Sequence, residues 1–253
     1  MDYKNLYSQR DAERNRRMED IIASQGFSIS EVLRHWPAYI QRRWLTRFLA
    51  HYELFRMVQE LPGSIIELGV YRGASFFTWA NLLETFFPGD RSRKVYGFDS
   101  FAGLNSEQFD DELDGERDGR DGKEDWAYQT PAGPIRELVK LHTEDNILPG
   151  IERCVLIEGD VFETVPAFLR DNPGLRVSLI HFDMDLYKPT RFCLEQFYPL
   201  ILRGGVLCFD EFGLVPWGGE TKAVEEFFGD RPPRMRKMPF SPTPGGYCIK
   251  DEA

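Results

Sequence analysis

The stretch SIIELGVYRGASFFTWANLLETFF (residues 64–87) decides the fold class. Its first seven residues are mostly apolar and typical of a buried strand, and the remainder is typical of a helix. Gly69 permits a tight turn between the two, and Gly73 lets a ligand or the helix approach the strand closely. The stretch therefore predicts one strand–turn–helix unit of an α/β protein.

The same alternation continues along the chain. Further strands are expected at 94–101, 154–161, 177–185 and 204–212, and helices at 164–170, 188–202 and 219–228. Strands that alternate with helices pair in parallel through right-handed crossovers, so the pattern predicts a doubly wound, mostly parallel sheet with helices on both faces. The tail 234–250 is typical of two more strands joined by a Pro/Gly turn, which makes seven strands in all.

Two segments lie outside this pattern. Before the first strand, Ser28 and Glu31 form a capping box, and apolar residues recur at helical spacing from 41 to 60. Residues 1–60 are therefore expected to be an N-terminal helical extension, and residues 61–253 the α/β domain. Residues 105–134 are acidic, Gly-rich and poor in aliphatic side chains, which favours an exposed loop or lid over a calcium-binding loop.

Composition narrows the classes of protein. The chain has 253 residues, 42% hydrophobic and 28% charged, as in an ordinary globular domain. Its net charge of −10 argues against a nucleic-acid partner. The sequence has no apolar stretch near the ~18 residues of a membrane span and no apolar signal core, so we expect a cytoplasmic protein without a membrane partner. The widely spaced cysteines are expected to be buried thiols, and His181, inside an apolar strand, a core residue rather than a base.

Acidic residues recur where the predicted strands end. They are Glu67, Asp99, Asp160, Asp183, Asp185, Asp210 and Glu211. Ligands of doubly wound sheets bind beyond the carboxyl ends of the strands. We therefore place the candidate site at this edge of the sheet.

One group of these residues predicts the cofactor. The Gly69–Gly73 spacing is neither the G-x-G-x-x-G of NAD sites nor a triphosphate loop, and Glu67 beside the turn would repel a pyrophosphate and attract an ammonium. Asp99 can accept both hydroxyls of a ribose, and Asp160 can accept from an adenine amino group. S-adenosylmethionine fits this description. The candidate cofactor-binding residues are Glu67, Gly69, Gly73, Ser75, Asp99, Ser100, Gly159, Asp160 and Asp183.

A second group predicts a metal site. Asp183 and Asp185 stand one residue apart after an apolar run, and a strand would place both on one face. Like charges that close stay ionised only if a cation or hydrogen-bond donors hold them. Because Asp210 and Glu211 end the adjoining strand, a metal site is favoured over a solvated turn or helix cap before Lys188.

These motifs resemble a known family. The segments IIELGVYRGAS, GFDSFAGL, DMDLYKPT and GGVLCFDEFG, spread from about residue 63 to 228, are similar to motifs of the macrocin O-methyltransferases. The resemblance implies a Rossmann-like class I S-adenosylmethionine-dependent enzyme that methylates sugar hydroxyls with Mg²⁺, and N-terminal helices that cover the substrate. It implies Asp183 and Asp210 as metal ligands and Asp185 as general base. Glu211 stands where the family usually has a second aspartate, so the resemblance implies it as a further metal ligand, and Met184 replaces a usual glycine.

The resemblance also implies the partners. The acceptor is expected to be a glycoside or an activated sugar with neighbouring hydroxyls, from a secondary metabolite or a surface glycan, and the protein a homo-oligomer. Two alternatives stay open at this point. One is a metal-dependent glycosyltransferase, which Glu67 beside the glycine turn argues against, and the other is a non-catalytic protein that binds an adenosine-containing ligand.

Overall fold

The computed structural model describes residues 3–104, 108–110, 113–114, 130–214 and 218–251. The chain forms two compact units, Met1–Leu45 and Thr46–Ala253. Most of the segment 105–134, expected from the sequence to be a loop or lid, lies outside the described residues. In the described part of the chain, no helix is long and apolar enough to cross a membrane.

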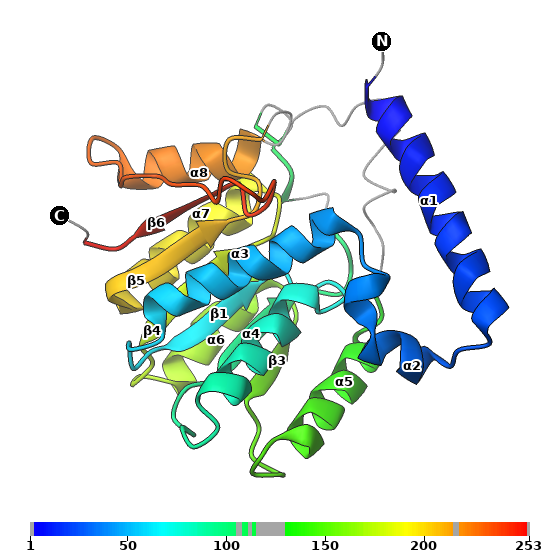
Figure 1. Cartoon of the computed structure of the whole chain (residues 1–253). Helices are drawn as coiled ribbons and strands as arrows, with labels where there is room; N and C mark the ends of the chain where they lie inside the picture. The colour runs from blue at the N-terminus through cyan, green and yellow to red at the C-terminus, as the bar shows by residue number, and fades with distance from the viewer. Residues whose placement is uncertain (1–2, 105–107, 111–112, 115–129, 215–217, 252–253) are drawn as a thin grey trace. The chain divides into compact units, whose positions relative to one another are not determined.

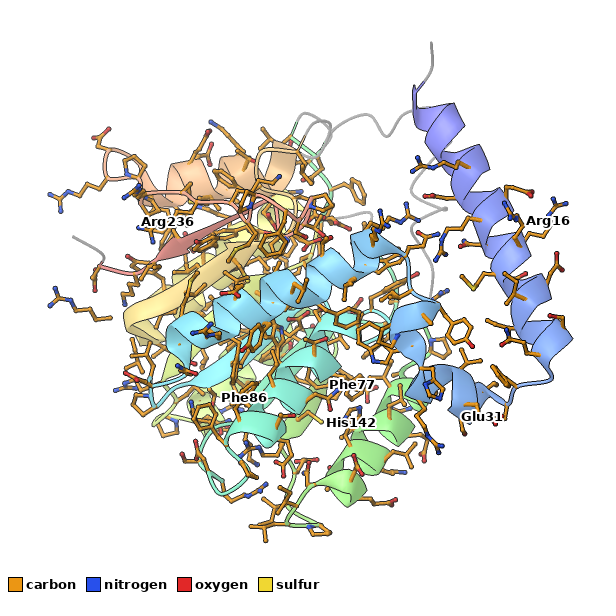
Figure 2. The ribbon with its side chains drawn as sticks, in the orientation of Figure 1. Arg16, Glu31, Phe77, Phe86, His142 and Arg236 are labelled. Atoms are coloured by element: carbon orange, nitrogen blue, oxygen red, sulfur yellow. The ribbon has the colours of Figure 1, made fainter. Side chains whose placement is uncertain are left out.

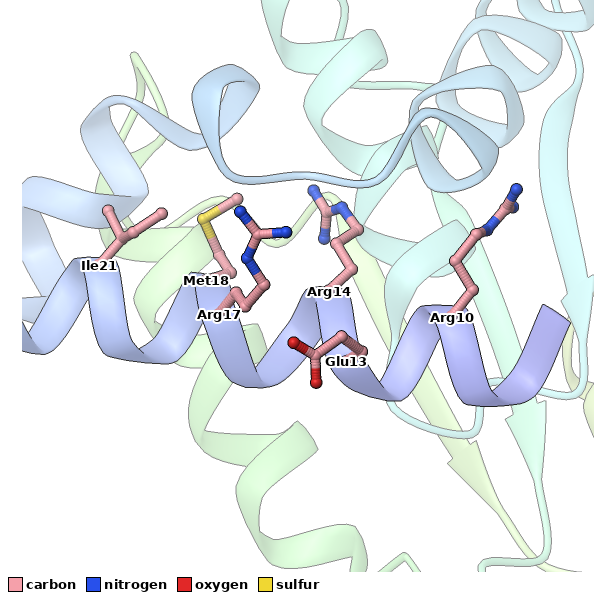
Figure 3. A pocket seen from close by; sticks show the side chains of 6 residues that line it. All are labelled: Arg10, Glu13, Arg14, Arg17, Met18 and Ile21. Carbon is pink, nitrogen blue, oxygen red and sulfur yellow. The ribbon is translucent and has the colours of Figure 1, made fainter. Parts of the chain in front are cut away.

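The first unit is helical. It contains α1 (Tyr3–Gln25), α2 (Ile29–Arg34), the 3₁₀ turn η1 (Trp36–Ala38) and the start of α3 (Arg42–Val58). The capping box predicted at the start of α2 is confirmed, because Ser28 Oγ accepts from the Glu31 N–H and the Glu31 carboxylate accepts from the Ser28 N–H. Six side chains of α1 line a hollow and are drawn in Figure 3: Arg10, Glu13, Arg14, Arg17, Met18 and Ile21.

The second unit is built on one six-stranded sheet. Its strands are β1 (Ser64–Leu68), β2 (Val95–Asp99), β3 (Cys154–Glu158), β4 (Val177–Phe182), β5 (Ile201–Phe209) and β6 (Gly246–Ile249). The spatial order is β3-β2-β1-β4-β5-β6, and only β6 pairs antiparallel. The connections contain α4 (Ala74–Phe86), α5 (Ala132–Asp145), α6 (Val161–Asp171), α7 (Tyr187–Phe197) with the turn η3 (Tyr198–Leu200), and α8 (Gly218–Phe228).

Alternating strand residues supply two hydrophobic cores. Ile65 and Leu179 pack with α3, α4 and α5, whereas Ile66 and Ile180 pack with α6, α7 and α8. Figure 1 shows α4 in front of the sheet and α6 behind it. Because successive strand residues point to opposite faces, these apolar runs can serve both layers. The prediction of a doubly wound, mostly parallel sheet is confirmed, as is that of buried cysteine thiols.

Two details of the predicted fold were wrong. The described chain has six strands, not seven, because the segment before β6 makes only one isolated bridge, between Arg236 and Tyr247. The prolines at 239, 242 and 244 have no N–H to donate to a ladder. Sequence reasoning also missed α5, which begins at Ala132, within the expected loop. Ile135 and Val139 of α5 are buried, and His142 stacks on Phe77 of α4 with ring centroids 4.4 Å apart (Figure 2).

Candidate active site

The turn between β1 and α4 lies against the end of β4. Gly69 has φ +94°, and a Cβ there would lie 1.9 Å from the Asp183 carbonyl oxygen. Gly73, the N-cap of α4, has φ +84°, and a Cβ there would lie 2.6 Å from the ring of Phe77. Both positions therefore require glycine, for backbone conformation and for space. The turn and the segment after β4 meet without intervening side chains.

Asp99 fixes the same turn from the end of β2. Its Oδ2 accepts from the N–H groups of Val70 at 2.8 Å and Tyr71 at 2.7 Å, and its Oδ1 accepts from Phe101 at 2.7 Å. A carboxylate has about four acceptor positions, so hydroxyl groups can still bind to it. Asp99 thus joins the glycine turn to the strand end at which a ribose was predicted.

The predicted adenine end lies beside Asp99. Gly159, with φ +131°, donates its N–H to the Asp99 carbonyl at 2.9 Å. Asp160 caps α6 through Oδ1, which accepts from Phe162 at 3.0 Å, and its Oδ2 accepts from the Gln108 amide at 2.6 Å. The Ser100 hydroxyl donates to the Gly103 carbonyl at 3.2 Å and is exposed. The candidate cofactor-binding residues at the ends of β2 and β3 are therefore neighbours in the structure.

Glu67 lies deeper than the sequence suggested. It has no exposed surface, and its carboxylate accepts from the Ser75 hydroxyl and, at 2.8 Å, from the Trp79 indole N–H. His181 Nδ1 is 3.0 Å from Glu67 Oε2. Both Glu67 oxygens therefore have partners inside the protein, and its contact with a cofactor ammonium stays a prediction.

His181 connects Glu67 to Asp210. The histidine is fully buried, as predicted, but its Nε2 lies 3.4 Å from Asp210 Oδ1 on the next strand. Burial alone would lower the pKa of His181, but the charge of Glu67 and the hydrogen bonds to both carboxylates raise it well above its ordinary value. The His181 ring thus links Glu67 on β1 to Asp210 at the end of β5.

The acidic side brings together three carboxylates. Asp183, Asp185 and Glu211 each offer an oxygen, and these oxygens all lie within 4.8 Å of one another. β4 ends at Phe182, so a turn and not a strand face brings the two aspartates together, with Asp185 at φ +63°. The predicted proximity is thus present, but the expected extension of the strand to 185 was wrong.

Asp210 occupies a different position from these three. It is 2% exposed, and besides His181 it contacts Arg47, whose Nη1 lies 3.1 Å from Oδ2. Arg47 comes from α3, and its Nη2 lies 2.7 Å from Asp183 Oδ2. Sequence reasoning missed Arg47. The available signal was its spacing to Ala50, His51, Leu54 and Val58, the buried face of α3.

Burial and neighbouring carboxylates raise the pKa of several acidic residues at this edge of the sheet. Glu220 on α8 is fully buried and accepts from the Glu211 N–H at 2.9 Å through Oε1. Burial and then the charge of Asp210 raise the pKa of Asp183 to about 7, in spite of Arg47. Burial and neighbouring carboxylates also raise the pKa of Glu211 and Glu220 well above the ordinary value. Burial and like charge thus favour the protonated form of these groups.

The comparisons with known proteins identify the family. A model of the macrocin O-methyltransferase family (TylF) matches residues 38–232, more than half of the chain. The chain belongs to this family. The fold agrees: the crystal structure of the calicheamicin methyltransferase CalS11 superposes with a TM-score of 0.85 at 30% identity, covering 96% of this chain and 93% of that one.

A second structure of CalS11 and two O-methyltransferases from Streptomyces are also similar to this chain. An apo structure of CalS11, described as a TDP-rhamnose 3'-O-methyltransferase, has a TM-score of 0.78 at 27% identity and covers 96% of this chain and 95% of that one. The tetracenomycin C rhamnosyl 4'-O-methyltransferase of Streptomyces olivaceus is 28% identical over 158 residues, 61% of this chain and 54% of that protein. The demethyldecarbamoylnovobiocin O-methyltransferase of Streptomyces niveus is 25% identical over 160 residues, 62% of this chain and 55% of that protein. The chain thus spans about half the length of these two relatives.

Proposed function

We propose that this chain transfers a methyl group from S-adenosylmethionine to a sugar hydroxyl in a site that holds Mg²⁺. The observation that carries the proposal is the cluster of Asp183, Asp185 and Glu211 beside the glycine turn. Membership of the macrocin O-methyltransferase family supports the reaction type. The named substrates of similar proteins support the class of acceptor.

The cofactor is proposed to lie along the carboxyl ends of β1, β2 and β3. Gly69 and Gly73 give the β1–α4 turn the conformation in which it would face the ligand, Asp99 accepts from the ribose hydroxyls, and Asp160 accepts from the adenine amino group. Ser100 and Gly159 flank these two aspartates. S-adenosylmethionine supplies the electrophilic methyl group when bound. Glu67, held by Ser75 and His181, supports the amino-acid end of the ligand.

The acidic cluster fits a hard divalent cation. Mg²⁺ prefers oxygen ligands, and Asp183 and Glu211 supply carboxylates, with Glu211 Oε2 buried and lacking a hydrogen-bond partner among the described residues. The family resemblance adds Asp210 to this set, although Arg47 and His181 contact its two oxygens here. Mg²⁺ would supply positive charge that makes a sugar hydroxyl more acidic.

Asp185 is the proposed general base. It lies within the carboxylate cluster and follows Asp183 in a left-handed turn that begins where β4 ends. Asp185 would take the hydroxyl proton of the acceptor while the acceptor oxygen bonds to the methyl carbon and the methyl–sulfur bond breaks, with S-adenosylhomocysteine as the leaving group. The acceptor class is a glycoside or an activated sugar, since the similar proteins are named for rhamnosyl and TDP-rhamnose substrates.

A binding and transfer assay tests the proposal. Calorimetry with S-adenosylhomocysteine, UDP and NAD should show binding of the first alone. Labelled S-adenosylmethionine, offered with a panel of TDP-sugars and rhamnosides, should transfer its label only to hydroxylated sugars and only with Mg²⁺ present. Binding of UDP without S-adenosylhomocysteine would indicate a glycosyltransferase. Transfer that persists in chelator would remove Mg²⁺ from the proposal.

A further inference from the structure

The positive side chain that lies on the acidic cluster is Arg47. Its guanidinium spans two carboxylates, with Nη2 at 2.7 Å from Asp183 Oδ2 and Nη1 at 3.1 Å from Asp210 Oδ2. Nη1 also donates to the Thr243 hydroxyl at 3.3 Å. The arginine side chain is 21% exposed, and Asp210 is almost fully buried. Ion pairs with so little solvent are screened far less than surface pairs.

The contacts of Arg47 limit what a metal ion can reach. One oxygen of Asp183 faces the guanidinium, and the two oxygens of Asp210 face Arg47 and His181. Asp183, Asp185 and Glu211 each have a carboxylate oxygen within 4.8 Å of the other two. Asp210 does not belong to this group. A divalent ion that used Asp210 would have to take the place of Arg47 or His181 at one of its oxygens.

We propose that Arg47 is a built-in competitor of the divalent cation, a positioning residue that sets the metal affinity of this enzyme. In the metal-free protein it neutralises part of the charge of Asp183 and Asp210 and holds them in place. When a divalent cation binds, the guanidinium would give up part of its ion pairing with Asp183 and Asp210. The loss of this ion pairing lowers the affinity for the cation. The inference rests on the proposed metal site and adds the residue that regulates its occupancy.

A purely structural role for Arg47 predicts the opposite change in metal affinity. If the arginine only shaped the site, its loss would disorder the ligands and weaken metal binding. If it competes, its loss removes a positive charge beside a divalent ion and strengthens binding. The direction of the change therefore separates the two roles, and turnover is not needed to see it.

The experiment measures Mn²⁺ binding by electron paramagnetic resonance on the full-length protein. The variants are Arg47→Gln, which removes the charge, Arg47→Lys, which keeps it, and Arg56→Gln as the control. Arg56 lies on the same helix, is exposed, and contacts Tyr52 instead of the carboxylates. Melting temperatures in chelator and in excess Mn²⁺ accompany each titration.

We expect Arg47→Gln to bind Mn²⁺ at least tenfold more tightly than the wild type, with Arg47→Lys and Arg56→Gln within about threefold of it. In chelator Arg47→Gln should melt below the wild type, and Mn²⁺ should close this gap. If a variant is too unstable in chelator, it is purified in Mn²⁺, and its Mn²⁺ affinity is measured by competition with a chelator of known affinity.

The other outcomes separate the inference from the proposed function. Wild-type binding of Mn²⁺ with equal or weaker binding by Arg47→Gln overturns the role of Arg47 and leaves the metal site intact. Absence of Mn²⁺ binding in every variant overturns both the metal site and the inference. Binding by Arg47→Gln alone supports the inference, since the competitor then excludes the ion from the wild type.

Discussion

At the scale of single residues, the two aspartates after β4 are expected to have different tasks. Asp185→Asn keeps most of the acidic cluster but cannot take the proton, so turnover should fall by roughly 10²–10⁴ and excess Mg²⁺ should not restore it. Asp183→Asn removes a charged ligand, so its rate should recover in part at high Mg²⁺. Rates measured against Mg²⁺ concentration distinguish the variants, and curves of the same shape would contradict the division of tasks.

Asp183 should also make metal binding depend on pH. Its pKa in the metal-free protein is raised to about 7 by burial and then by Asp210, so below that pH the carboxyl is protonated and the proton competes with the cation. The affinity for Mn²⁺ should therefore fall as the pH is lowered, by roughly fivefold between pH 7 and pH 6. Titrations at several pH values test this dependence. Asp183→Asn should bind more weakly, with a flatter pH profile, and an unchanged slope would assign the proton to another group.

At the scale of elements, the β1–α4 turn packs against the segment after β4. We expect this contact to determine how much stability a substitution of Gly69 costs. Gly69→Ala would place a Cβ 1.9 Å from the Asp183 carbonyl, whereas a Cβ at Gly150, which has a similar φ of +85°, would point into open space with nothing within 4 Å. Backbone strain alone costs about 1–2 kcal/mol in either variant. We expect Gly69→Ala to lose at least 2 kcal/mol more than Gly150→Ala in urea unfolding, because backbone at the strand ends must move. Equal losses of unfolding free energy in the two variants would mean that the backbone at Asp183 moves aside at no cost.

The element scale also shows what sequence patterns can predict. The five parallel strands were predicted because each is an apolar run that serves two cores, and the glycine turn because its residue types are constrained. Helix α5 was missed because only Ile135 and Val139 are buried along it. The apolar stripe predicted along 41–60 was only partly right: Phe55 is buried, but Phe48 is 36% exposed and the buried face contains His51 instead. Polar residues on a buried helical face weaken the apolar periodicity on which such predictions rely.

For the site, sequence reasoning found the acidic residues but not their partners. Strand ends in a parallel sheet meet at one edge, so Asp99, Asp183 and Glu211 could be assigned to one region. The pairing of Glu67 with His181 depends on the register of β1 against β4, which no local pattern specifies. Arg47 depends on how α3 packs on the sheet. Such contacts between distant segments are the part that required the structure.

At the scale of the whole molecule, Mg²⁺ should stabilise the fold. Among the described residues of the second unit, burial and neighbouring carboxylates raise the pKa of Asp183, Glu211 and Glu220. A cation present at one hundred times its Kd adds about 2.7 kcal/mol, which for a chain of this size raises the melting temperature by roughly 5–10 °C. Calorimetry in Mg²⁺ and in KCl of equal ionic strength checks this. Equal shifts in the two salts would indicate general screening instead of a site.

The pairing of β1 with β4 has a consequence for how the molecule folds. The Glu67–His181 contact joins residues 114 positions apart, and β6, which closes the sheet beside β5, lies near the end of the chain. Contacts over such sequence separations form only after a large loss of chain entropy, so they slow folding. During synthesis, Glu67 and His181 can meet only once β4 has left the ribosome. A shortened nascent chain would have the glycine turn without the strand that supports it.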